Sequence, residues 1–161
     1  MLGTLFKALF VTLIIVAITA VLGLTIMAGV AGTHDVKPID MPKASSLAHI
    51  AGASNYVIAY RVPMEFNTYR TIAEVIANAS FTGDSELHRS EHEVVYGGSM
   101  PGLTYQVGYV LDRDAYPPTL AMVTVARITD RKGRYTLKVL RPIYRCLSPY
   151  LLDRLASRAP N

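Results

Sequence analysis

The chain has a single cysteine, Cys146, and no tryptophan. One cysteine excludes a disulfide within the chain and any metal cluster held by several thiolates, and it leaves the redox compartment open. Low-complexity tracts and internal repeats are also lacking, which excludes a repeat architecture. The residues that follow position 33 are numerous enough for one compact domain with a core, but not for two.

Charge is absent from one long stretch. Residues 8–33, 26 in all, hold no ionisable side chain and consist mainly of Leu, Ile, Val, Ala and Phe. At about 1.5 Å per residue, a helix of this length extends roughly 39 Å, more than the ~30 Å hydrocarbon core of a bilayer. A continuous helix also pairs its own backbone polar groups in lipid. We therefore expect residues 1–33 to form a transmembrane anchor.

A cleaved secretory signal is the alternative, because Lys7 precedes the apolar run and Gly29-Val30-Ala31 resembles a cleavage site. The run is about twice as long as a usual signal core, which favours retention. The charges after the run cancel, so Lys7 and the terminal amine favour a cytoplasmic N-terminus. The prediction is a single-pass protein of the cell membrane with an extracytoplasmic, periplasmic domain.

Small residues recur in the anchor at helical spacing and would let another membrane helix approach closely. Glycine is also common in membrane helices for other reasons, so that alternative stays open. The expected partners are membrane lipid and other membrane-protein subunits. The helix-packing candidates are Gly23, Ala28, Gly29 and Gly32.

Positive charge gathers near the C-terminus. Residues 127–158 carry nine Lys and Arg against two Asp, a balance of +7, whereas residues 34–126 carry six basic and ten acidic residues, a balance of −4. This split predicts that the C-terminal segment faces lipid head groups, an acidic partner or the acidic half of its own domain. No nucleic-acid-binding module accompanies the charge, so no nucleic-acid partner is expected. The basic interaction face comprises Arg134, Lys138, Arg141 and Arg145.

The rest of the chain divides into a proline-containing linker, residues 34–54, and a domain, residues 55–161. Spacing of three and four predicts a helix after the first strand and a long helix at the C-terminus. The expected fold is α+β: a small, mainly antiparallel sheet domain closed by a long C-terminal helix. Alternating or apolar runs predict strands at 56–62, 93–96, 103–111 and 120–128.

Breaks in these patterns predict the connections. Residues 81–91 are polar and are predicted to form a loop, and Gly97 to Gly102 a turn. In the closing helix Pro142 predicts a kink or a new helix. Ser148-Pro149, a capping residue followed by a first-turn proline, predicts a break.

Three motifs mark the closing helix: Lys-Gly-Arg-Tyr at 132–135, Val-Leu-Arg-Pro-Ile-Tyr-Arg at 139–145, and Leu-Leu-x-Arg at 151–154. Together with the first strand, Asn55 to Val62, they resemble the DUF2867 family of uncharacterised bacterial proteins over about residues 55–158. Tyr144 stands where that family commonly has His, and the Gly-Arg to Tyr spacing is one residue shorter.

The resemblance implies a fold similar to START and Bet v 1-like helix-grip domains, in which a curved sheet wraps a long C-terminal helix around an apolar cavity. The tyrosines of the predicted strands lie on strand faces that we expect to point at the core or at such a cavity. A buried tyrosine removes apolar area from water and keeps a hydroxyl that needs a hydrogen-bond partner, so a set of tyrosines can line an amphipathic pocket. Ordinary core packing is the alternative. The ligand-pocket candidates are Tyr56, Tyr60, Tyr105 and Tyr109.

The sharpest catalytic pattern is His88-Arg89-Ser90-Glu91-His92, an H-x-x-E-H string in which a helix would present two zinc ligands and a general base. The strand predicted at once after it leaves no room for that helix, so we interpret the string as a polar loop, with His88 and His92 as weak metal candidates. Ser45, Ser46 and Ser99 lack a nucleophile-elbow context. No cofactor is expected.

Three functions follow from these observations. The leading hypothesis is a non-catalytic membrane accessory subunit that docks on or stabilises a larger membrane-protein complex. The second is a membrane-tethered carrier of an apolar small molecule (a lipid, quinone or pigment) in a helix-grip cavity. The third, less favoured, is a metal-dependent hydrolase.

Overall fold

The computed structural model describes residues 23, 35–64, 71–76 and 85–157. The chain divides into two units, Met1–His34 and Asp35–Asn161, and the second contains all the elements that follow. In the first unit only Gly23 is described, and it is helical. The rest of the predicted anchor, with Ala28, Gly29 and Gly32, lies outside the described residues. Among the residues described, no helix combines the length and the apolar character needed to cross a membrane.

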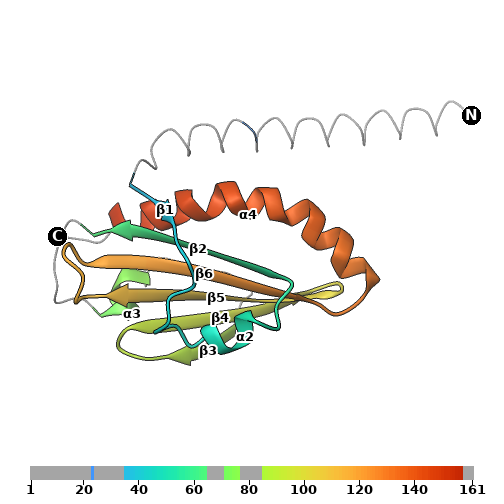
Figure 1. Cartoon of the computed structure of the whole chain (residues 1–161), viewed down its shortest axis with the longest axis horizontal. Helices are drawn as coiled ribbons and strands as arrows, with labels where there is room; N and C mark the ends of the chain where they lie inside the picture. Colours follow the sequence, from blue (N-terminus) through green and yellow to red (C-terminus); the bar gives the residue numbers. More distant parts are fainter. Residues whose placement is uncertain (1–22, 24–34, 65–70, 77–84, 158–161) are drawn as a thin grey trace, which may run out of the picture. The chain divides into compact units, whose positions relative to one another are not determined.

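The second unit is built on a six-stranded antiparallel sheet, ordered β1-β2-β6-β5-β4-β3 (Figure 1). The first long strand therefore pairs with the last, and the remaining strands follow as hairpins. With the closing helix, this confirms the expected α+β fold. The strands are β1 Lys37–Pro38, β2 Tyr56–Pro63, β3 Ser85–Arg89, β4 Glu93–Met100, β5 Leu103–Asp112 and β6 Thr119–Ile128.

The sheet differs from the prediction at two places. Part of the predicted loop 81–91 is β3, whose residues are all exposed and so show no apolar alternation. Strand β4 continues through the predicted turn at Gly97, which pairs with Ser85 of β3 and with Gln106 of β5. Leu87 of β3 packs where a Cβ at Gly97 would stand. The turn comes later, at Pro101-Gly102, where Gly102 has a φ of 74°.

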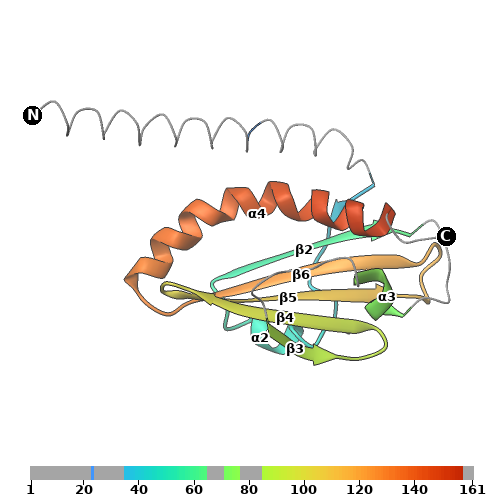
Figure 2. The same ribbon diagram turned by 180° about the vertical axis from the view of Figure 1, so that it is seen from behind.

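In the described part of the chain the helices beside the sheet are α2 Ala48–Ala51, α3 Ile72–Ile76 and α4 Arg131–Ser157. The predicted break at Ser148-Pro149 is wrong, since α4 runs through both of its prolines as one helix. Ser148 and Leu152 are buried and hold that turn against the sheet. Figures 1 and 2 show that α4 curves along the sheet, as prolines inside a helix make it do.

The start of α4 is locked to the β4–β5 turn. The Asp130 carboxylate accepts a hydrogen bond from the Gly133 N–H at 3.0 Å and caps the helix. A Cβ at Gly133 would collide with the carbonyl oxygen of Gly102. Only a residue without a side chain allows this approach of helix and turn.

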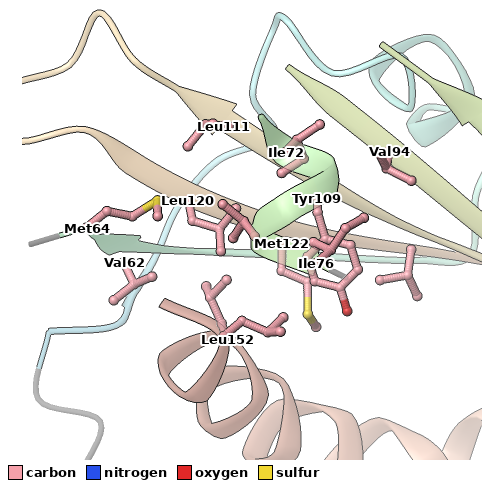
Figure 3. Packing of buried hydrophobic residues seen from close by; sticks show 13 residues of the cluster. Val62, Met64, Ile72, Ile76, Val94, Tyr109, Leu111, Leu120, Met122 and Leu152 are labelled. Carbon is pink, nitrogen blue, oxygen red and sulfur yellow. The ribbon is translucent and has the colours of Figure 1, made fainter. Parts of the chain in front are cut away.

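One face of the sheet, here called the helix face, carries the main core. Leu152 of α4 points at Leu120 and Met122 of β6, and Ile72 of α3 packs beside Tyr109 (Figure 3). These side chains are among the most deeply buried in the domain. Both helices therefore cover the same face.

The opposite face is covered by residues 39–51, which include α2. Leu47 is buried there against Ala59, Val95 and Val123. Ala59 and Val123 pair with each other and alternate along their strands with Tyr60 and Met122 of the helix face, so they point to the opposite side of the sheet. The segment predicted as a linker thus supplies an edge strand and half of a second core. The sequence pattern did not predict this packing, because prolines and polar residues interrupt the apolar periodicity of the segment.

The two edges of the sheet are short or irregular. Strand β1 has two residues and ends in Pro38. Strand β3 carries a bulge between Glu86 and His88, which brings Glu86 and Arg89 to one face, where they form an ion pair.

Candidate functional site

A cavity of about 810 Å³ lies on the opposite face, between the sheet and the segment 39–46. The β3–β4 turn and the β5–β6 connection complete its walls. This volume is in the range of small-molecule sites. Its charged and polar lining includes Asp40, Lys43, Arg61, His88, His92, Glu93, Asp112, Arg113 and Asp114.

The floor of the cavity follows from strand register. Arg61 pairs with Ala121, Ala121 with Val110, and Val110 with Glu93, so these four residues form one row across β2, β6, β5 and β4. Small apolar side chains occupy the middle of the row, with a cation at one end and a carboxylate at the other. The row therefore places the Arg61 guanidinium at one end of the cavity floor and the Glu93 carboxylate at the other.

Glu93 ties the covering segment to this floor. It is 5% exposed, and its carboxylate accepts hydrogen bonds from the Ser45 hydroxyl at 2.7 Å and from the Ser46 N–H at 2.8 and 3.1 Å. The Ser45 Oγ in turn accepts a bond from the Leu47 N–H at 3.2 Å. These bonds satisfy the buried carboxylate and fix the roof of the cavity.

His88 and His92 both line the cavity but do not form a zinc site of the predicted kind. His88 lies on β3 and His92 in the turn before β4, so the helix that the H-x-x-E-H string requires is not formed. Within the described ranges, no group of three His, Cys, Asp or Glu side chains is placed to hold a metal ion.

The four tyrosines named as ligand-pocket candidates lie on one face of the sheet. Through β6, Tyr56 and Tyr105 pair with Ala126, and Tyr60 and Tyr109 with Met122, which places all four on the helix face. They belong to or pack against the core clusters beneath α4, and none lines the large cavity. A ligand-binding role for them stays a prediction.

Two of these tyrosines interact with α4. The Tyr60 hydroxyl donates a hydrogen bond to the Arg145 carbonyl oxygen at 3.2 Å, and the Arg141 guanidinium lies 6.0 Å from the centre of the Tyr56 ring. Burial raises the pKa of both phenols, and Arg145 partly offsets the rise in each. These contacts hold the basic helix on β2.

All four cations of the predicted basic face are exposed on α4. Beside this row, one helical turn apart, stand two exposed apolar side chains: Tyr135 at 72% and Val139 at 64%. Sequence reading missed this pair, although its spacing of four was visible. We call the combined set the α4 outer surface: Arg134, Tyr135, Lys138, Val139, Arg141 and Arg145.

Comparisons with known proteins yield no relative: no family model, no curated protein and no solved structure matches the chain.

Proposed function

We propose that the protein is a non-catalytic, single-pass membrane accessory subunit whose domain docks on a larger membrane-protein assembly. The observation that carries the proposal is the short connection between the predicted anchor and the sheet. Only residues 34–36 separate the apolar stretch from β1. Three residues extend at most about 11 Å, so the domain would work at the membrane surface.

The topology supports the resemblance on which the fold proposal rests. The resemblance implies a curved sheet that wraps a long C-terminal helix. The packing of α4 along one face of the sheet supports it (Figure 1). We accordingly propose a small helix-grip domain related to the DUF2867 family.

The test is purification of the full chain from native membranes in mild detergent, followed by identification of the proteins that accompany it. The expected result is one recurrent set of membrane subunits. Because small residues are proposed to seat the anchor against them, Gly29→Leu with Gly32→Leu should lose that set. Leu22→Ile with Leu24→Ile is the matched control and should retain it. Recovery of the wild type as a lone monomer would contradict the proposal.

A second candidate function, carriage of a small ligand, is favoured by the cavity on the opposite face. Its charged rim suits a polar molecule better than the lipid, quinone or pigment expected from the resemblance. Native mass spectrometry of the purified chain should then show a bound molecule that Ala121→Trp, which fills the floor, displaces. An unliganded mass for the wild type would remove this candidate.

A further inference from the structure

The α4 outer surface is strongly cationic over a long distance. Residues 131–152 include six Lys and Arg and no Asp or Glu. The four cations of the surface recur at spacings of four, three and four, so they form one row along the helix. Within residues 131–152 of α4, no acidic residue stands beside this row to neutralise it.

Apolar side chains adjoin the row. Tyr135 and Val139 project into solvent although the core beneath them is complete without them. Cations beside an aromatic and an aliphatic side chain on one helix are typical of helices that lie in the head-group region of a bilayer. There the ring and the isopropyl group leave water while the cations meet phosphates.

The chain enters the domain next to this helix. Val36, the last residue before β1, packs against the cluster that contains Leu152 and Leu155 of α4. Asp35 is close enough to Asp153 of α4 to contribute to the raised pKa of that carboxyl, whose main cause is burial. Asp35 and Val36, the first described residues of the domain, therefore lie beside α4.

We propose that the α4 outer surface lies on the anionic lipid head groups of the bilayer in which the chain is anchored. The proposal rests on the proposed anchoring and names the partner of the basic face. An acidic protein would also attract the cations. Lipid is favoured because the apolar pair lies alongside the cations and because the tether keeps α4 within reach of the bilayer.

The test uses the full chain in nanodiscs of phosphatidylcholine, with or without phosphatidylglycerol. A nitroxide is attached at Val139→Cys in a Cys146→Ser background, and its collisions with a water-soluble nickel complex are measured by electron paramagnetic resonance. Phosphatidylglycerol should lower the collision rate roughly fivefold, because it draws the helix into the head groups. High salt should restore the rate while the chain stays in the disc. A label at Leu87→Cys, 54% exposed on β3, should not respond.

Charge variants identify the cause. Replacement of Arg134, Lys138, Arg141 and Arg145 by Gln should abolish the effect of phosphatidylglycerol. The matched control replaces four exposed cations elsewhere, Lys43, Arg61, Arg127 and Arg154, by Gln and should preserve it.

Failures of the two proposals are distinguishable. A chain that stays in the disc but shows the same collision rate in both lipids would overturn the lipid surface and leave the anchor standing. Protection of Val139 that appears only when a co-purified acidic protein is added would also overturn it, in favour of that protein. A chain that does not enter the disc would overturn the anchor and the lipid surface together.

Discussion

At the residue scale, a few polar groups connect parts of the chain that are distant in sequence. Glu93 joins the covering segment to the sheet, and the Thr129 N–H, just before α4, donates a hydrogen bond to the Gly102 carbonyl oxygen in the turn before β5. A buried carboxylate is tolerated only where donors satisfy it, so each partner of Glu93 is needed. Such groups fix where the cavity roof and the closing helix lie.

Glu93→Ala should destabilise the domain by about 1–3 kcal/mol, because it leaves the Ser45 hydroxyl and the Ser46 N–H without their acceptor. Chemical unfolding followed by circular dichroism measures this. The control is Glu91→Ala, at an exposed position two residues away, which should change stability by less than about 0.5 kcal/mol. Equal effects of the two substitutions would show that the carboxylate does not secure the roof.

Asp153 has a pKa raised above 3.8, first by burial and then by Asp35. The folded state therefore favours the protonated carboxyl, and the resulting stability is lost as pH rises through the raised pKa. Asp153→Asn should accordingly stabilise the domain near neutral pH, by at most about 0.5 kcal/mol. The gain should vanish below pH 3.8. A gain in stability that persists in acid would exclude the Asp153 charge as its cause. Asp114→Asn, at an exposed position, is the control.

At the element scale, sequence patterns predicted the strands and the helix that have a face buried in the core. Strands β2, β5 and β6 alternate or are apolar throughout because at least one face is in the core, and α4 shows its stripe for the same reason. Strand β3 was missed because it is exposed along its length and so shows no apolar face. The cavity was missed because its row of residues comes from four strands, and register across strands is not visible in sequence.

Leu152 tests the grip of α4 on the sheet. It is fully buried, so Leu152→Ala should cost about 2–5 kcal/mol through lost apolar contact and a residual cavity. Thermal or denaturant unfolding of the full chain is the measurement. Leu87→Ala, which removes the same atoms from a half-exposed position, should cost less than about 1 kcal/mol. Similar losses would mean that α4 does not close the core.

The contact of Gly133 with Gly102 tests the junction of α4 with the β4–β5 turn. Gly133→Ala should destabilise the domain by about 1–3 kcal/mol or more, since the new methyl group meets backbone that cannot yield without moving the helix. Gly52→Ala is the control: it has open space and an ordinary φ of −62°, so it should be neutral or stabilise by about 0.4–1 kcal/mol. A harmless Gly133→Ala would show that helix and turn are not in contact.

At the scale of the whole molecule, an apolar segment precedes a domain whose acidic and basic halves are unequal. The charge split was legible in the sequence, and so was the row of cations on α4. The partner of this surface could not be predicted from the sequence, because charge and exposure indicate which charge a surface attracts but do not identify the molecule that binds it. The sequence also did not predict that residues 39–51 cover one face of the sheet, because this depends on their packing against strands that come later in the sequence.

The anchor proposal predicts the behaviour of a charged variant. Ile18→Arg with Val21→Arg should move the protein from the carbonate-resistant membrane fraction to the soluble fraction, since each arginine adds about 2.5–3.5 kcal/mol to the cost of insertion. Ile18→Leu with Val21→Leu should remain in the membrane. Wild-type protein recovered as a soluble form beginning after Ala31 would show a cleaved signal instead.

In the proposed membrane-anchored state, the edges of the sheet decide whether neighbouring copies of the domain associate. Proteins confined to a membrane plane collide often and in similar orientations, and unpaired strand edges then invite lateral aggregation. Here Pro38 lacks an N–H to offer a neighbour, and β3 presents a bulge flanked by charged side chains. Both are features that discourage strand addition. Crowded copies of this domain should thus remain individually dispersed, with the sheet closed to growth at either side.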